Sequence, residues 1–528
     1  MSERAPSPEK RPHIGAFVLE TLTLGMYGEP RHTLREYVQN AYDSIRAAQR
    51  TKFLTGRGRV DVTIAPEAIT IRDNGLGVRA DLAWVTLTSI GASRKDRARD
   101  VGFRGIGRLA GMAYCEELVF RTTFPGETTL STVRFDCNKL LAAMSPDEGG
   151  DTELATLLSD AITLDQQEKG AESEEHFFEV QLTGLSRAPE ALKNATEVGD
   201  YLSETVPVGF SQQWSRREEI EADYRAYFGA PLETIDVYVS AADAMSQLFK
   251  PYGDTYQQQK GIAQLQNLEF HHGDNQRYWG WVGYLSESGA VTDWKTRGLR
   301  IRARNIQVDG TQIFESMFTD VKPSYGRFST YFVGEIHIDP EAVIPNARRD
   351  GFEENDAWLS IKKSLRAEIC EPLARHAYQA SQDQQADVEK VIEAIDRLAE
   401  RSHSLADNSK ATYDQVVDLM NTAKRLRRKA ASALKSVSDL DDTAVDQGAP
   451  RADLHSSRLQ DAAKSVEGVE TQARMLIGHF LQEDERLVAL KRRIREEVII
   501  ELLEIVNAFV DAGTYQRIKR QLIKNTQG

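Results

Sequence analysis

Three short segments near the start of the chain hold the residue types best suited to chemistry. EYVQNAYD, from Glu36 to Asp43, contains two carboxylates and an amide at helical spacing; DNGLG, from Asp73 to Gly77, is an acidic turn; and GFRGIGRLAG, from Gly102 to Gly111, is glycine-rich. Backbone N–H groups of a glycine-rich segment can bind phosphate oxygens, and a carboxylate held beside them can activate water. Each segment alone is common, but their order and spacing together predict an ATP site.

A single amphipathic helix is expected to position the first segment. From Thr33 to Ala48 the apolar residues recur at helical spacing, while Glu36, Asn40 and Asp43 share a different, polar face. Asn40 follows Glu36 by one helical turn, so the two side chains lie on the same face. An isolated helix with this pattern usually presents its polar face to solvent, and that alternative stays open here.

A β-hairpin is expected to position the second segment. The residues from Val60 to Ile71 alternate as two strands, and DNGLG follows where the second strand ends. A helix is expected from Leu82 to Ile90 and another from Leu109, with a long loop between them. Strands at EELVFRTTF, STVRFD and HFFEVQLTGL extend the sheet. The acidic stretch near residues 145–176 is typical of a solvated surface insertion, with a helix from Leu154 to Ile162.

The remainder of the chain divides into a region with strand patterns and a region with helical patterns. Strands at TIDVYVS, WGWVGYLS, LRIRARNIQVD and YFVGEIHID indicate a second α/β region after Trp214. Further on, an apolar seam of heptad type from Val388 to Leu405 indicates long helices. An interruption at Gly448 predicts a helical hairpin. We therefore expect domains at residues 1–214, 215–375 and 376–528.

Composition limits the functional classes. The chain has 528 residues, 41% of them apolar and 28% charged, with a formal net charge of −14 that argues against broad binding to nucleic acid or anionic membranes. The apolar stretch VIIELLEIVNAFV is too short to span a bilayer and suggests a dimer interface. The N-terminal segment lacks a secretory signal, and the three cysteines have neither disulfide nor zinc spacing. We therefore expect a soluble, cytoplasmic protein whose metal arrives with a ligand.

In this order, the three segments resemble the nucleotide site of the GHKL ATPase superfamily, which includes gyrase B, MutL, MORC proteins and the ninety-kilodalton heat-shock chaperones. The resemblance covers roughly residues 15 to 210. It implies an α+β chain with an N-terminal GHKL (Bergerat) α/β sandwich, a second α/β domain of transducer type and a C-terminal α-helical coiled-coil region. A P-loop is excluded because the chain has no GxxxxGK[ST], and a sensor histidine kinase is disfavoured because no phosphoacceptor histidine precedes the domain.

The resemblance assigns roles to the first two segments. Glu36 matches the glutamate that polarises the attacking water, and Asn40 matches the ligand of the Mg²⁺ that bridges the phosphates. Asp43 completes this stripe. Asp73 matches the aspartate that reads the exocyclic amine of adenine. The glycines that let the backbone approach the base are Gly75 and Gly77.

The glycine-rich segment resembles the phosphate lid of the superfamily. Its backbone N–H groups are expected to bind phosphate oxygens, with Arg104 or Arg108 adding charge. The preceding IGASRK resembles the lid of MutL and MORC relatives, so Ser93 and Lys95 are expected to contact phosphate. A basic surface loop is the competing interpretation. The nucleotide-binding residues assigned to the lid are Ser93, Lys95, Gly102, Arg104, Gly105, Ile106 and Gly107.

A fourth segment lies in the second region. AVIPNARRDGFEEN, from Ala342 to Asn355, resembles the catalytic loop of the heat-shock chaperone middle domain. By that resemblance Arg349 reaches the γ-phosphate as a second catalytic residue and Asn346 holds the loop. The chain has Glu353 where the chaperones usually carry a glutamine. A helix-capping loop with exposed arginines is the alternative.

These assignments predict a Mg²⁺-dependent ATPase that closes as a homodimer when it binds ATP. Chaperone-like action on protein clients is the expected use. A MORC- or MutL-like DNA clamp, or an ATPase of bacterial-immunity type, is the alternative, with the basic run Lys424 to Lys435 as its candidate DNA contact. A nucleotide-regulated scaffold with little hydrolysis is a third interpretation.

Overall fold

The computed structural model describes most of the chain in two compact units, Met1–Gln379 and Ala380–Gly528. Each unit is treated by itself below. The described residues are 14–15, 18–20, 29–91, 107–144, 153–169, 175–242, 244–259, 261–308, 310–346, 349–406, 411–441, 452–507 and 510–524.

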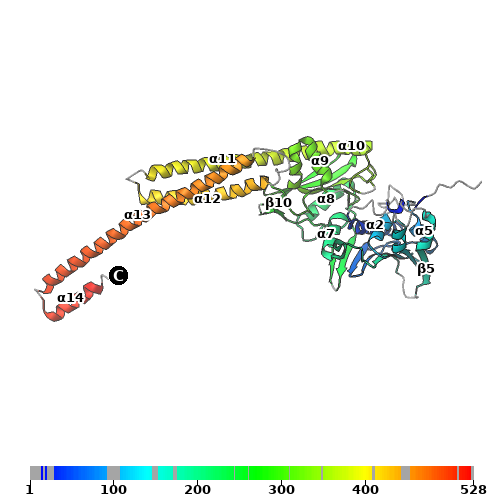
Figure 1. Ribbon diagram of the computed structural model, residues 1–528, viewed down its shortest axis with the longest axis horizontal. Helices are drawn as coiled ribbons and strands as arrows, with labels where there is room; N and C mark the ends of the chain where they lie inside the picture. The colour runs from blue at the N-terminus through cyan, green and yellow to red at the C-terminus, as the bar shows by residue number, and fades with distance from the viewer. Residues whose placement is uncertain are drawn as a thin grey trace, which may run out of the picture. The chain divides into compact units, whose positions relative to one another are not determined.

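An eight-stranded sheet forms the first half of the first unit (Figure 1). Its spatial order is β5-β4-β3-β6-β2-β1-β7-β8, and every pairing is antiparallel except that of β1 with β7. The predicted hairpin of β1 and β2 is confirmed. The strands are β1 Arg59–Ala65, β2 Ala68–Asp73, β3 Glu117–Thr123, β4 Thr129–Asp136, β5 Ile162–Glu168, β6 Phe177–Thr183, β7 Asp236–Ala241 and β8 Ala244–Gln247.

Helices pack on one face of this sheet and share its core. In α2, His32–Arg50, the predicted apolar stripe from Leu34 to Ala48 is buried, and it contacts strand residues such as Val62 and Ile71. In α7, Ala195–Thr205, Val198 and Leu202 enter the same core. The remaining helical segments of this half are η1 Ala80–Leu82, α3 Ala83–Thr88, η2 Gly107–Ala113, α4 Cys137–Ala143, α5 Leu154–Ala161 and α6 Glu190–Lys193.

Two strands of the first sheet, β5 and β7, have a different place from the one expected from the sequence, and β8 was not predicted. β5 lies within the acidic stretch that we interpreted as a surface insertion, where it pairs with β4 although nearly all of its side chains are exposed. β7, formed by residues of TIDVYVS, was expected in the second region, but it pairs with β1 in the first sheet. Backbone hydrogen bonds to a neighbouring strand stabilise both, and neither partner is visible in the local sequence pattern.

A six-stranded sheet forms the second half of the first unit, in the order β13-β12-β14-β11-β10-β9. Helices α9 and α10 pack on one face with Val282 and Ile336, whereas α8 packs on the other face with Trp279 and Trp281. The strands are β9 Thr255–Gln258, β10 Gly261–His272, β11 Tyr278–Leu285, β12 Gly298–Ala303, β13 Ile306–Gln307 and β14 Val333–Ile338. The helices are α8 Arg217–Phe228, η3 Asp274–Gln276, α9 Gln312–Val321, η4 Pro323–Tyr331, α10 Asp356–Leu365 and the π-helical η5 Arg366–Cys370.

The second unit is helical, as expected. α11 Glu371–Ala406, α12 Tyr413–Asp441 and α13 Ala452–Asn507 share a core that includes Ile395, Leu419 and Val466, and α14 Ala512–Lys524 follows (Figure 1). A break after Ala406 that the sequence analysis did not predict yields three packed helices instead of a hairpin. Within the described residues, no helix combines the length and apolarity that crossing a bilayer requires.

Candidate functional site

The polar stripe of α2 is not a solvated face. Glu36 exposes 7% of its surface and Asp43 exposes 4%, while Asn40 is half-buried. A buried carboxylate requires a charged or hydrogen-bonding partner. Glu36 Oε1 lies 3.2 Å from Arg349 Nε and 3.8 Å from Arg35 Nη2. The structure therefore brings together the two residues that the sequence analysis assigned to catalysis.

Arg349 comes from the predicted catalytic loop of the second region. Pro345 and Phe352 form a β-bridge that closes this loop, and Asn346 donates from Nδ2 to Asp350 Oδ1 at 2.7 Å. Arg349 has a φ of +59°, an unfavourable region for a residue with a side chain, and its side chain is only 10% exposed. The alternative of an exposed arginine does not fit Arg349.

The start of η2 lies directly against Glu36. A β-carbon added at Gly107 would be 2.4 Å from Glu36 Oε2, so only glycine fits there without displacing the carboxylate. Tyr37 of α2 fixes this contact because its hydroxyl donates to Arg108 O at 3.1 Å and accepts from Gly111 N at 2.9 Å. Gly107 of the glycine-rich segment is thus held against Glu36, the residue predicted to activate water.

Most of the predicted lid lies outside the described residues. This holds for Ser93, Lys95, Gly102, Arg104, Gly105 and Ile106. Arg108, the residue after Gly107, is described: burial lowers the pKa of its guanidinium, and its buried Nη1 has no hydrogen-bond partner in the described part of the chain. A buried cationic group with an open donor fits an anionic ligand.

Asp73 ends β2 at a place where the sheet changes from apolar to polar. On one face, Ile71 is followed by Asp73, and in register on β6 and β3 lie Phe178 and Thr122. Asp73 is 3% exposed, and its Oδ1 accepts a hydrogen bond from Gly75 N at 2.8 Å. The carboxylate is therefore held in a fixed orientation at the strand end.

The DNGLG turn packs tightly against the helix and the sheet. A β-carbon at Gly75 would lie 2.3 Å from Ser44 Oγ on α2. At Gly77, φ is +69° and a β-carbon would lie 2.2 Å from Thr123 O. Both glycines are required by close backbone approach. The general preference of turns for glycine is therefore not needed to explain them.

Three site residues were not predicted from the sequence. Thr122 Oγ1 accepts from Val78 N at 2.9 Å, which ties the residue after DNGLG to β3. Thr123 Oγ1 is buried and, among the described residues, has no hydrogen-bond partner. His176 Nδ1 lies 2.5 Å from Gly75 O. The two polar residues that end the apolar strand EELVFRTT were the available signal, but only the folded sheet shows that they lie against the DNGLG turn, at Gly77.

Asn40 is the candidate ligand for a metal ion at this site. The described residues contain no group of three or more His, Cys, Asp or Glu side chains placed to hold a metal ion. Mg²⁺ in phosphate sites typically takes only one or two oxygens from the protein and the rest from phosphates and water. The single amide oxygen of Asn40, one turn from Glu36, is a donor of the required type.

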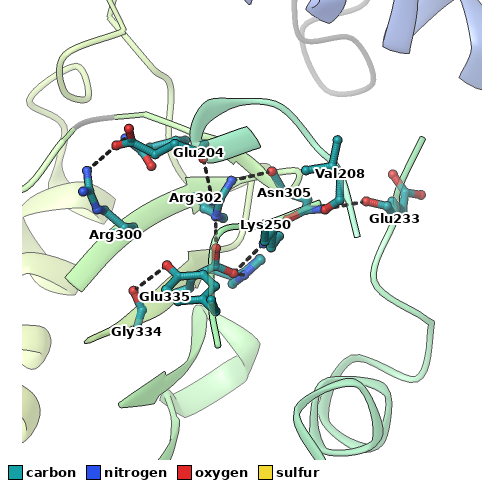
Figure 2. Close-up of polar contacts among 12 residues, drawn as sticks. Glu204, Val208, Glu233, Lys250, Arg300, Arg302, Asn305, Gly334 and Glu335 are labelled. Carbon is teal, nitrogen blue, oxygen red and sulfur yellow. Dashed lines mark hydrogen bonds and ion pairs between the residues drawn. The ribbon is translucent and has the colours of Figure 1, made fainter. Parts of the chain in front are cut away.

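A buried ionic cluster lies between the two sheets (Figure 2). Lys250, which follows β8, places Nζ 2.5 Å from Glu335 Oε2 on β14, and Arg302 of β12 pairs with the other oxygen of Glu335. All three side chains are at most 1% exposed. Arg302 also donates from Nη2 to Glu204 O at 2.7 Å, at the end of α7. We call Lys250, Arg302, Glu335 and the neighbouring His337 the Glu335 cluster.

In the Glu335 cluster, the negative charge of Glu335 is balanced by the positive charges of Arg302 and Lys250, which contact it. Burial alone would raise the pKa of Glu335, but Arg302 and Lys250 outweigh it and hold that pKa well below its usual range. Burial and the nearby Arg302 lower the pKa of Lys250 to about 7. Burial also lowers the pKa of His337 to about 4, against the opposing effect of Glu335. Because paired buried charges resist separation, the cluster fixes the second sheet to α7 and the end of β8.

Comparison with known families agrees with the geometry of the site. Residues 29–148 match the family model described as histidine kinase-, DNA gyrase B-, and HSP90-like ATPase. Comparison with curated proteins gave no match. The matched range begins just before α2 and includes the stripe of Glu36, the DNGLG turn and Gly107. Over these residues, the chain carries an ATPase domain of the GHKL superfamily.

Proposed function

We propose that the protein binds ATP and hydrolyses it to ADP and phosphate, with Glu36 orienting the attacking water. One observation carries the proposal: the buried Glu36 carboxylate touches both the end of the glycine-rich segment and Arg349 of the second region. A carboxylate on a rigid helix next to phosphate-binding backbone is suited to this role.

The other site residues divide the remaining tasks. Asp73 would read adenine, and Asn40 would hold a Mg²⁺ ion, which would supply positive charge to neutralise the phosphates. Arg108 and Arg349 stabilise negative charge that develops on the γ-phosphate. Because Arg349 engages Glu36 Oε1, this contact must open before the carboxylate can orient water and the guanidinium can reach phosphate. Hydrolysis is then gated by movement of the second region's loop.

We propose chaperone-like action on protein clients, by a homodimer, as the use of this ATPase. The proposal is supported by the net charge of −14, which repels nucleic acid, and by the contact of the Arg349 loop with Glu36. The DNA-clamp alternative is supported by the exposed cations of α12, including Arg425, Arg428 and Lys429.

Exchange of Glu36 tests the catalytic assignment. Glu36→Gln keeps the shape of the side chain and removes its charge, so we expect phosphate release to fall about a hundredfold or more while ATP is still bound. Glu67→Gln, at an exposed position in the turn between β1 and β2, is the matched control. Phosphate release by Glu36→Gln at the wild-type rate would exclude Glu36. Absence of turnover in the wild-type protein, with ATP bound, would favour the scaffold.

The chaperone-like use and the DNA-clamp use can be distinguished by measuring DNA binding at increasing salt concentration. A DNA clamp in its ATP-bound form should retain DNA with an affinity that falls steeply as salt increases. A chaperone-like ATPase should instead suppress aggregation of an unfolded client in an ATP-dependent way and show no such DNA retention. Triple substitution of Arg425, Arg428 and Lys429 by Gln should leave client protection unchanged.

A further inference from the structure

The C-terminal half of α13 carries an exposed apolar stripe. Leu487, Ile494, Val498 and Ile505 expose 50%, 52%, 48% and 58% of their surfaces. Another side of the same helix is covered, because Leu503 is buried and α14 packs against α13. Leu490 and Leu502 beside these residues are exposed as well, and an exposed apolar surface on a helix that already has one covered side indicates an interaction surface.

These residues belong to a seam with heptad spacing, and the spacing is symmetric about the centre of the segment. Its positions follow one another at steps of four, three, four, three and four residues. When two such helices lie antiparallel about a two-fold axis, Leu487 of one copy faces Ile505 of the other, and Ile494 faces Val498. The seam consists of Leu487, Lys491, Ile494, Val498, Glu501 and Ile505.

The two polar seam positions specify the orientation. In the antiparallel arrangement, Lys491 of each copy faces Glu501 of the other, so both polar layers contain opposite charges. In a parallel arrangement in register, Lys491 would face Lys491 and Glu501 would face Glu501. Like charges in a seam are unfavourable, so the sequence selects antiparallel pairing.

The charges around the seam agree with this orientation. Between residues 486 and 505 all cations precede all carboxylates, and each of these side chains is exposed. Antiparallel pairing therefore lays the basic half of one helix along the acidic half of the other. The cations are Arg486, Lys491, Arg492, Arg493 and Arg495, and the carboxylates are Glu496, Glu497, Glu501 and Glu504.

We propose that residues 487–505 of α13 dock antiparallel on the same segment of a second copy of this chain. The proposal rests on the homodimer of the proposed function and specifies its partner surface, orientation and register. It involves no residue of the nucleotide site, so the size of the protein in solution tests it independently of ATP turnover.

Charge exchange at the seam is the decisive experiment. Lys491→Glu in the full chain places Glu against Glu in two symmetric layers. Glu501→Lys places Lys against Lys in the same two layers. We expect each single variant to weaken the dimer about a hundredfold, from about tenfold in each layer. The double variant restores opposite charges and should return to wild-type affinity. Sedimentation velocity over a concentration series measures all four proteins.

A matched control reverses the charge of Arg492, a residue of the same helix that lies outside the seam. Arg492 Nε lies 3.5 Å from Glu496 Oε1 within one helix, away from the seam. Arg492→Glu should weaken the dimer much less than either seam variant does. The proposal is overturned if the wild-type chain is monomeric at all concentrations, if the single seam variants dimerise normally, or if the double variant does not recover.

Cross-linking tests the orientation separately. A chain with Leu487→Cys, mixed with a chain with Ile505→Cys, should form a disulfide between the two chains under mild oxidation. The native cysteines Cys115, Cys137 and Cys370 are buried and do not compete. Disulfides formed by the Leu487→Cys chain alone would indicate parallel helices and contradict the proposal.

Discussion

At the scale of single residues, Glu36 is defined by groups that lie far from it in the sequence. Gly107 leaves space for one carboxylate oxygen, and Arg349 engages the other. The hydroxyl of Tyr37 connects the helix to η2 on the same side. The position of the Glu36 carboxylate is therefore set from two sides by segments that are distant in the sequence.

Gly107→Ala tests this arrangement without touching Glu36 itself. The new methyl group would lie 2.4 Å from Glu36 Oε2 and must displace the carboxylate. A displacement on the order of 1 Å lowers turnover by about a hundredfold, so we expect that loss of phosphate release with a largely unchanged thermal midpoint.

Gly56→Ala is the matched control, because a β-carbon there meets nothing within 4 Å. Normal turnover of Gly107→Ala would show that the described position of Glu36 is not the one used in hydrolysis.

The residues that sequence reasoning could identify are those with local patterns. Helical spacing places Glu36, Asn40 and Asp43 on one face, and Asp73 lies in a turn that ends a strand, but their roles in a nucleotide site come from the resemblance to the GHKL superfamily. Thr122 could not be identified in this way, because it lies on β3, two strands from Asp73, and its hydrogen bond with Val78 N exists only in the folded sheet. The strained backbone of Arg349 also depends on contacts from outside its segment.

At the scale of elements, the Glu335 cluster connects α7 and the end of β8 to two strands of the second sheet. Glu204 ends α7, Lys250 follows β8, and Arg302 and Glu335 lie on neighbouring strands of the second sheet. Local patterns predicted β11, β12 and β14 of the second sheet but missed β9 and β10. They could not predict the order of strands in each sheet or the place of β7, because strand order depends on pairing between distant segments.

The cluster makes stability depend on pH through His337. Its ring is buried and neutral in the folded state, with a pKa near 4, whereas the unfolded chain takes up a proton below about 6.5. The stability is therefore fully present above pH 6.5 and is lost as the pH falls towards 4, by at most about 3 kcal/mol.

His337→Gln should flatten the fall in thermal midpoint between pH 7 and pH 5. His403→Gln, at an exposed position on α11, should leave that fall unchanged. Burial also lowers the pKa of His32 to about 4, so part of the fall should persist. Identical slopes for the wild-type protein and His337→Gln would show that this ring is not buried as described.

At the scale of the whole molecule, the proposed dimer predicts how turnover depends on concentration. If closure of two copies limits hydrolysis, turnover per chain should rise with protein concentration in the full chain and be constant in a fragment of residues 1–379. The fragment must extend past residue 375, because Ala377 of α11 is buried in the core of the second sheet. A constant rate in the full chain would contradict dimer-gated hydrolysis.

The pairing of β1 with β7 has a further consequence, for folding during synthesis. α8 precedes β7 in the sequence but packs on the second sheet, so the two sheets are interleaved along the chain. While the ribosome is still translating, β1 has unpaired backbone groups on one side until residues 236–241 emerge, and such strands are templates for aggregation. β1 is thus paired on both sides only after the whole of α8, which packs on the second sheet, has been synthesised.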